Sequence, residues 1–380
     1  GIFISSNVNS ETYDLVYRHP IVNALPVYSK DGAFIAAFTE SGEPKYAFFN
    51  NEDPTAIVLK IFVDSFPNHY VSVVNLTDNN EKALVHVSSD REVGQFYLYD
   101  LKTNKAEPLI NLSPWFEPSK LAKRTPIVVK ARDGIELHGY MTLPLNQDAK
   151  NLPLVVIPHG GPHRTRDHFG FDEEAAFLAD NGYAVLQINF RGSGGYGPKF
   201  DRMGYRKWGL SMQDDITDAT LWMVEQGIVD KNRMCISGAS YGGYASLMGV
   251  VKEPDLYKCA VSYVGVSDLV LMYSKGDTQR DDSGVSYLKE ALGDDQDDLK
   301  ARSPAYQAAK IKANILLVHG LEDVRVDPAH YRNMENALKA VGKKPELLIK
   351  SKEAHGFVSE ENRKEYFDTL LDFLHRNIGK

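Results

Sequence analysis

The clearest pattern along this chain is a series of short, unbroken apolar runs that alternate with helix-like segments after residue 124. These runs occupy residues 154–158, 184–189, 234–237, 260–263, 315–319 and 346–349. Strands that are apolar on both faces are typical of a parallel sheet covered by helices on each side. Two further strands flank Arg132-Asp133-Gly134, a turn sequence that predicts a hairpin before the series.

The first third of the chain follows a different pattern, in which Gly, Asn, Asp or Pro separate short strands and no helical periodicity is expected. The expected strands lie at 33–38, 44–49, 70–74, 82–87 and 95–100. This pattern predicts antiparallel β-structure. Residues 14–50 and 78–102 each resemble one blade of a β-propeller. Prolines with polar neighbours mark the joint with the rest of the chain at residues 114–122.

The β-region is too short for a closed propeller, which needs about four to eight blades, whereas two or three fit here. An open pair of blades leaves strand edges exposed, and the chain begins with Gly1 rather than methionine. We therefore expect a partial propeller at 1–118, from a longer polypeptide whose earlier blades are missing, and an α/β domain at 119–380. The alternative is a small self-contained β-domain.

The pentapeptide Gly-Ala-Ser-Tyr-Gly at 238–242 follows an apolar run and precedes a helix-like segment. This is the setting of a nucleophile elbow, a strand that turns so sharply into a helix that side chains at its flanks would clash. Glycines at the outer positions relieve the crowding and leave the serine projecting above the sheet. The pattern predicts Ser240 as the nucleophile of an α/β-hydrolase fold. The alternative is a glycine-rich turn that carries an ordinary serine.

A serine hydroxyl needs a base and an orienting carboxylate, which follow the serine along the chain in this fold. His355 is the best candidate base because it lies in a loop directly after the strand-like run at 346–349. The alternative is a surface-loop histidine. His319 and His330 are interpreted as structural.

Asp323 is the favoured acid because it lies in the loop that follows the buried run at 315–319. Parallel strands end at the same edge of a sheet, so the loops that carry the serine, the acid and the base can converge there. Glu322 and Asp327 compete in the same loop. Asp268 is the main rival, because some hydrolases place the acid one strand earlier.

An oxyanion hole requires two N–H donors. One is the backbone N–H of the residue after the nucleophile, Tyr241. The second is expected from the loop after the run at 154–158, where two consecutive glycines let the backbone approach a ligand, and Gly161 is the candidate. Val266 and Leu269, which follow a later strand, are candidates for an apolar pocket that holds the residue before the cleaved bond.

Composition limits the partners. The chain has 43% hydrophobic and 25% charged residues, as ordinary globular proteins do. Its net charge of −8 argues against nucleic acid and against an anionic membrane as partners. No apolar run approaches the ~18 residues that suggest a membrane span. No signal peptide is recognisable, but a missing N-terminus would have carried one, so cytoplasmic and exported locations both stay open.

No metal or other cofactor is expected, because no metal-binding motif is present. The acidic run at 293–298 lacks the glycine and terminal glutamate of a calcium loop and is interpreted as a solvated turn. Cys235 and Cys259 lie in strand-like core segments and are interpreted as buried thiols. As strand neighbours they could lie close enough to bond, although two cysteines are no disulfide framework.

Several motifs together resemble the hydrolase half of the prolyl oligopeptidase family, nearest its acylaminoacyl-peptidase and dipeptidyl-peptidase-like branch. They occur in the family's order over roughly residues 120 to 380: the segments at 159–163, 189–197, 238–243, 319–323 and 354–356. The resemblance implies Ser240 as nucleophile, His355 as base and Asp323 as acid. It also implies an oxyanion hole from Gly161 and Tyr241.

The resemblance further implies that Arg325 holds a backbone carbonyl of the substrate. Prolyl oligopeptidase itself uses a tyrosine hydroxyl in the oxyanion hole, whereas the corresponding loop here carries glycine, which points to the acylaminoacyl branch. Dipeptidyl peptidases grip a free N-terminus with paired glutamates of their propeller, and this sequence has no match to that segment.

The sequence thus predicts a serine peptidase that cleaves short peptides through an acyl-enzyme. The alternatives are a carboxylesterase on the same fold and a binding protein that has lost activity. The expected partners are peptide substrates and the missing propeller blades of the same polypeptide, and a homo-oligomer stays open.

Overall fold

The computed structural model describes residues 1–4, 13–145 and 147–379; the other residues of the two predicted domains, 5–12, 146 and 380, lie outside the described part. The chain divides into two compact units. The first comprises Gly1–Pro126, His168–Phe177 and Gly195–Gly197, and the second comprises Ile127–Asp167, Leu178–Gly194 and Pro198–Lys380. The first boundary falls close to the predicted joint. The sequence patterns did not indicate that two later segments join the first unit.

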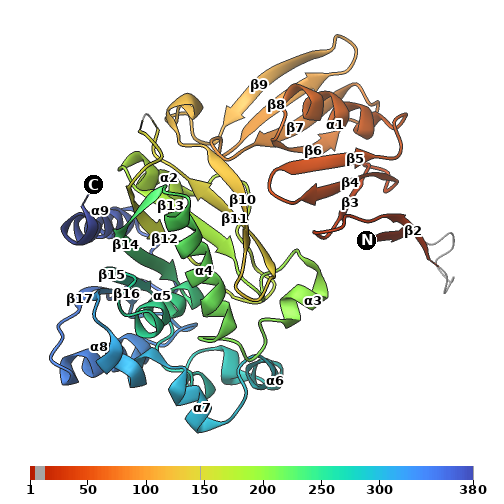
Figure 1. Ribbon diagram of the computed structural model, residues 1–380. Helices are drawn as coiled ribbons and strands as arrows, with labels where there is room; N and C mark the ends of the chain where they lie inside the picture. Colours follow the sequence, from red (N-terminus) through yellow and green to blue (C-terminus); the bar gives the residue numbers. More distant parts are fainter. Residues whose placement is uncertain (5–12, 146, 380) are drawn as a thin grey trace. The chain divides into compact units, whose positions relative to one another are not determined.

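The first unit contains small antiparallel sheets (Figure 1). Their strands are β1 (Ile2–Ile4) with β2 (Asp14–Tyr17); β3 (Leu25–Tyr28), β4 (Phe34–Glu40) and β5 (Pro44–Phe48); and β6 (Tyr70–Leu76), β7 (Lys82–Ser88), β8 (Gln95–Asp100) and β9 (Lys105–Asn111). The last group is a four-stranded meander, as one propeller blade would be. The expectation of antiparallel β-structure is therefore confirmed for this part of the chain.

One helix in the first unit contradicts the expectation that this region has no helical periodicity. Helix α1 (Pro54–Ser65) begins after Asp53, whose carboxylate accepts hydrogen bonds from the N–H groups of Thr55 and Ala56. Val58, Leu59 and Phe62 are buried, and this i, i+1, i+4 spacing is that of a helix face. Both the cap and the periodicity were present in the sequence.

The second unit is built on a mixed sheet of eight strands in the order β10-β11-β13-β12-β14-β15-β16-β17. Strand β11 runs antiparallel to β13, whereas the successive pairs from β13 through β12 to β17 are parallel. The strands are β10 (Arg124–Lys130), β11 (Glu136–Thr142), β12 (Leu152–Val156), β13 (Ala184–Asn189), β14 (Val229–Ala239), β15 (Cys259–Tyr263), β16 (Asn314–Gly320) and β17 (Glu346–Lys350). This is the α/β-hydrolase arrangement that the sequence predicted.

Helices alternate with these strands along the chain (Figure 1). They are α2 (Glu173–Asp180), α3 (Gly197–Arg202), α4 (Ser211–Glu225), α5 (Tyr241–Lys252), α6 (Asp282–Ala291), α7 (Gln296–Ala301), α8 (Ala329–Ala340) and α9 (Glu360–Ile378). Helix α5 packs on β14 and β15, and α9 packs on β14 to β17. In the described part of the chain, no helix combines the length and the low polarity that a membrane crossing requires.

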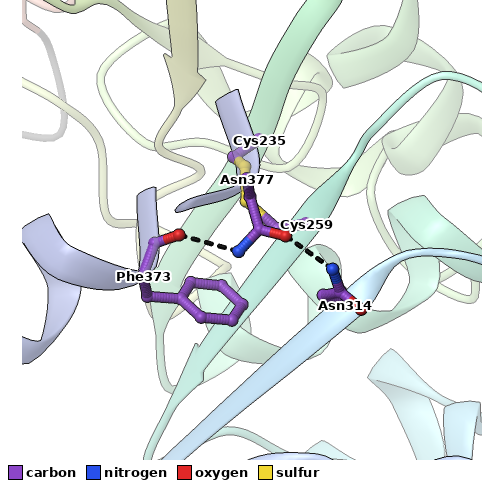
Figure 2. Close-up of a disulfide and its surroundings, with 5 residues drawn as sticks. All are labelled: Cys235, Cys259, Asn314, Phe373 and Asn377. Carbon is purple, nitrogen blue, oxygen red and sulfur yellow. Dashed lines mark hydrogen bonds between the residues drawn. A yellow bond between two sulfur atoms is a disulfide. The ribbon is translucent and has the colours of Figure 1, made fainter. Parts of the chain in front are cut away.

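Consecutive residues of β14 point to opposite faces of the sheet, as in any strand. Ile236 packs near Gly249 of α5. Cys235 faces the other side, where Figure 2 shows it beside Asn377 and Phe373 of α9. Cys235 lies opposite Cys259 of β15 and forms a disulfide with it, with the two Cα atoms 4.8 Å apart. The burial predicted for both cysteines is confirmed, but their interpretation as thiols is wrong.

Candidate active site

The sharp turn after β14 carries Ser240. The backbone of Ser240 has φ 59° and ψ −118°, a conformation that costs a residue other than glycine about 1–3 kcal/mol. Its N–H donates to the carbonyl of Tyr263 at 2.9 Å, and its own carbonyl accepts from Tyr244 N–H at 3.1 Å. The surrounding hydrogen bonds therefore hold the serine in a strained turn between strand and helix.

The glycines on either side of the turn are required by close backbone contacts. A Cβ atom on Gly238 would lie 2.6 Å from the carbonyl carbon of Gly242, and one on Gly242 would lie 2.1 Å from the carbonyl oxygen of Pro158. At either distance, the added Cβ atom would overlap with the backbone. The strand, the turn and the helix thus have the geometry of the nucleophile elbow that the sequence predicted.

The structure brings Asp323 and His355 together. Asp323 lies in the loop after β16 and is 3% exposed. Its Oδ2 is 2.8 Å from Nδ1 of His355, which lies in the loop after β17. Its Oδ1 accepts the N–H groups of Arg325 and Val326, each at 2.9 Å. Because both oxygens are engaged, the carboxylate is fixed in one orientation and holds the imidazole with it.

The competing carboxylates have other partners. Asp268 accepts the N–H groups of Val270 and Leu271 at 3.0 and 3.2 Å, and so closes the turn after β15. Asp327 accepts the N–H of Ala329 at 2.8 Å, at the start of α8. Glu322 is exposed. Among the candidate acids, Asp323 is therefore the one that the structure pairs with His355.

Tyr263, at the end of β15, connects the serine turn to the loop of His355. Its carbonyl accepts the N–H of Ser240, and its hydroxyl accepts the N–H of Phe357, two residues after His355. Its ring packs on the Phe357 ring with centroids 5.2 Å apart and on that of Tyr366 at 4.7 Å. No hydrogen bond joins Ser240 Oγ to His355 within the described residues. Tyr263 thus connects the two loops.

Glu353 fixes the loop of His355 at its other end. Its carboxylate accepts the N–H groups of Val358 and Ser359 at 2.8 and 3.1 Å and the side-chain amide of Asn362 at 2.6 Å. These hydrogen bonds, the bond from Asn362 above all, lower the pKa of the Glu353 carboxyl. The carbonyl of Glu353 also accepts the N–H of Glu322 at 2.9 Å, so the acid loop and the base loop are joined directly.

A pocket of about 270 Å³ opens beside Ser240. Its apolar walls come from Trp208, Val266, Met272, Tyr287 and Val326. Val266, a predicted pocket residue, is among these wall residues. Leu269 is fully buried in the hydrophobic core and is not part of the pocket lining.

The proposed oxyanion donors lie at the same pocket, which Gly161 and Tyr241 both line. The N–H of Tyr241 lies in the first turn of α5, where a helix has no carbonyl of its own to receive it. The loop of Gly161 lies against the elbow, since a Cβ atom on Gly160 would be 3.3 Å from the carbonyl of Ala239.

The remaining lining includes Arg325, which the sequence resemblance singled out, together with Lys275 and Thr278. Arg325 Nε lies 3.1 Å from the carboxylate of Asp277. Sequence reasoning did not find Asp277 or Lys275, because they lie in an irregular loop without a pattern of its own.

Two buried histidines lie next to the acid loop. His319 Nε2 is 2.9 Å from the carbonyl of Val326 and 3.6 Å from Asp323 Oδ2. His330, in α8, accepts the N–H of Ser267 at 3.3 Å and borders the pocket. Burial lowers the pKa of both imidazoles, that of His330 to about 3. The structure therefore gives both residues internal contacts, in keeping with the structural interpretation.

The segment at 189–197 contains a buried ion pair. The Arg191 guanidinium makes two hydrogen bonds to the fully buried carboxylate of Asp215 in α4, at 2.9 and 2.6 Å. It also pairs with Asp133 at 2.8 Å. Charged groups at this depth require such pairing. The arginine therefore fixes the loop after β13, a role that composition and spacing did not reveal.

The chain is similar to known peptidases. The model of the prolyl oligopeptidase family matches residues 169–380. Dipeptidyl aminopeptidase BIII of Pseudoxanthomonas mexicana is 34% identical over 321 residues, which are 81% of this chain and 46% of that protein. Dipeptidyl peptidase family member 6 of Caenorhabditis elegans is 28% identical over 347 residues, 84% of this chain and 47% of that protein.

Among solved structures, acylaminoacyl peptidase of Pyrococcus horikoshii superposes with a TM-score of 0.74 at 24% identity, over 91% of this chain and 54% of that one. This likeness shows a common fold. The chain spans about half the length of the relatives that it matches. The match of the family model over more than half of the sequence establishes that the chain belongs to the prolyl oligopeptidase family of serine peptidases.

Proposed function

We propose that this protein cleaves short peptides through an acyl-enzyme, with Ser240 as nucleophile, His355 as base and Asp323 as the orienting acid. The observation that carries the proposal is the 2.8 Å contact between Asp323 and His355, on the loops after two parallel strands of the sheet that also carries Ser240. The strained turn at Ser240 and the pocket beside it support the same role.

In the proposed reaction, the Nδ1–H of His355 donates a hydrogen bond to Asp323, which leaves Nε2 as the basic nitrogen. Nε2 takes the proton of Ser240 Oγ as that oxygen attacks the substrate carbonyl, and later gives it to the leaving amine. The backbone N–H groups of Gly161 and Tyr241 stabilise the oxyanion. The hydrogen bond between Ser240 and His355 forms in the substrate complex, where catalytic contacts tighten.

The proposed substrates are peptides from which an acylated residue or a short N-terminal unit is released. The names of two relatives, a dipeptidyl aminopeptidase and an acylamino-acid-releasing enzyme, describe these two reactions in those proteins. The pocket has room for one side chain between its apolar walls. Arg325 lines the pocket, and its proposed role is to bind a carbonyl of the substrate backbone.

The experiment compares turnover of N-acyl-amino-acid anilides, free dipeptidyl anilides and simple esters by the wild type and by Ser240→Ala. We expect hydrolysis of at least one anilide class by the wild type and none by the variant. Circular dichroism of both proteins shows whether the variant is folded.

Two results would contradict the proposal. Turnover of esters alone would identify a carboxylesterase. Absence of any Ser240-dependent turnover, in a protein that circular dichroism shows to be folded, would identify a binding protein.

A further inference from the structure

The lining of the pocket beside Ser240 includes the exposed Lys275, whose positive charge no group of the lining balances. Its lining includes two cations, Lys275 and Arg325, and no Asp or Glu. Arg325 is paired with Asp277, which lies outside the lining. Within the described part of the chain, no carboxylate lies within 4 Å of the Lys275 ammonium. An ammonium beside apolar walls is a binding group for a carboxylate.

The loop that carries Lys275 is attached to the acid loop. The N–H of Lys275 donates to the carbonyl of Leu271 at 2.9 Å. The next residue, Gly276, packs so closely that a Cβ atom on it would lie 2.6 Å from the carbonyl oxygen of Arg325. Asp277 then pairs with the Arg325 side chain at 3.1 Å. Contacts at three successive residues thus keep Lys275 at the pocket.

The pocket therefore has two kinds of surface. Trp208, Met272 and Val326 are among the residues that provide apolar wall, whereas Lys275 and Thr278 provide a cation and a hydroxyl. A side chain with a short apolar stem and a carboxylate at its end matches both. Because Ser240 and Gly161 line the same pocket, the side chain that enters belongs to the residue whose carbonyl the serine attacks.

We propose that Lys275 makes this pocket a subsite for an acidic side chain, so that the enzyme prefers glutamate or aspartate immediately before the cleaved bond. This inference rests on the proposed function, since it names the substrate class of the same site. It concerns binding alone and adds no chemical step. The group recognised is a carboxylate on the acyl side of the substrate.

The test uses two anilides of equal shape, N-acetyl-glutamyl and N-acetyl-glutaminyl p-nitroanilide, so that charge is the only difference. Neither has a C-terminal carboxylate, so a preference comes from the side chain. We expect wild-type kcat/KM to be roughly fivefold higher for the glutamyl substrate, the size of a partly exposed ion pair. Lys275→Met retains the length of the side chain and should abolish the preference, and Lys275→Glu should reverse it.

The matched control is Lys344→Met, which removes the same charge from an exposed lysine that does not line the pocket. It should retain the wild-type preference. Equal kcat/KM for the two substrates in the wild type, or a preference that survives in Lys275→Met, would overturn the inference. The proposed function stands in either case, provided that hydrolysis depends on Ser240.

A binding measurement decides the question even if neither anilide is hydrolysed. Quenching of tryptophan fluorescence, to which Trp208 in the pocket wall contributes, reports ligand binding to Ser240→Ala. We expect N-acetyl-glutamate amide to bind more tightly than N-acetyl-glutamine amide, and the difference to vanish in Ser240→Ala/Lys275→Met. Equal affinity of Ser240→Ala for the two ligands would contradict the inference.

Discussion

The two units of the chain bury their strands differently. In the second unit, β12 and β13 are buried at every position. In the first unit, β7 alternates between buried and more exposed positions, and β9 is exposed along its whole length. A strand covered on both faces tolerates little change, whereas a half-covered strand leaves one side free. In the second unit, the candidate active site lies on the loops that follow β14, β16 and β17.

One pocket in the first unit and one in the second differ in the charge of their lining residues. The first unit contains an apolar pocket of about 340 Å³, lined among others by Leu25, Phe38 and Leu59 and by no charged residue. The pocket of the second unit contains a candidate nucleophile and two cations. Volume alone would not separate the two. The chemistry of the lining residues separates the two pockets. The following substitutions test how far the two units differ.

The largest effect is expected from Asp323→Asn. An asparagine can still accept the N–H groups of Arg325 and Val326, but it favours the wrong tautomer of His355. We expect kcat/KM to fall about 10⁴-fold while the fold is retained. Steady-state kinetics with the anilides, together with thermal unfolding, measure both. A loss below tenfold would show that His355 does not depend on this carboxylate.

The core of the first unit is tested by Phe62→Ala. Phe62 is 2% exposed and packs against the rings of Phe66, Tyr97 and Tyr99. Its removal should lower the free energy of unfolding by about 3–5 kcal/mol, measured by urea denaturation. Ile61→Ala is the control, because Ile61 lies on the same helix and is 37% exposed. Equal effects of the two changes would indicate that this unit has no packed core.

Tyr263→Phe tests the connection between the serine turn and the loop of His355. The change removes the hydroxyl that accepts the N–H of Phe357 and keeps the ring. An unsatisfied N–H costs about 1–3 kcal/mol, so we expect kcat/KM to fall about tenfold, chiefly in kcat. The exposed Tyr306 gives the control, Tyr306→Phe. A change confined to KM would assign Tyr263 to substrate binding instead.

The pH dependence of stability in the second unit should include a contribution from His330. Burial lowers the pKa of its imidazole to about 3, so it stays neutral in the folded protein while the unfolded chain takes up a proton near its ordinary value of 6.5. Stability is therefore complete above pH 6.5 and falls as the pH drops toward 3. The slope approaches about 1.4 kcal/mol per pH unit.

His330→Asn should reduce this slope between pH 6 and pH 4 by about 1.4 kcal/mol per pH unit, which corresponds to one proton. Urea denaturation at several pH values measures it. If the slope is the same in the variant, other groups cause the acid sensitivity. His319, whose pKa burial also lowers, is one such group.

The smallest effect is expected from Leu109→Ser on β9. Leu109 is 52% exposed, and surface changes of this kind usually alter stability by less than about 0.5 kcal/mol. Urea denaturation measures the stability, and size-exclusion chromatography measures self-association. A marked loss of stability would show that the exposed face of this strand is covered in solution.

Much of the second unit could be predicted because its signals are local. Each apolar run is a strand, and the glycines around Ser240 occupy positions of the elbow where a Cβ atom would clash with the backbone. Asp323 and His355 were found from their position after such strands. Asp268 could be separated from Asp323 only by the contact of Asp323 with His355, because both aspartates accept the N–H groups two and three residues later.

What could not be predicted depends on contacts between distant segments. Arg191 and Asp215 are 24 positions apart and make one ion pair. Tyr263 acts through a hydroxyl that reaches a residue 94 positions later. The disulfide could not be predicted without knowing that Cys235 and Cys259 lie opposite each other on adjacent strands. Helix α1 is different, since both its cap at Asp53 and the apolar spacing after it are local signals in the sequence.

Glu353 has a consequence for how the site responds to a bound peptide. Its carbonyl holds the acid segment through Glu322, and its carboxylate holds the chain just beyond His355. A ligand that displaces one of these segments must carry the other along, so the spacing between imidazole and carboxylate is preserved during the movement. Because Arg325 and Val326 line the pocket, this part of its wall moves together with the imidazole.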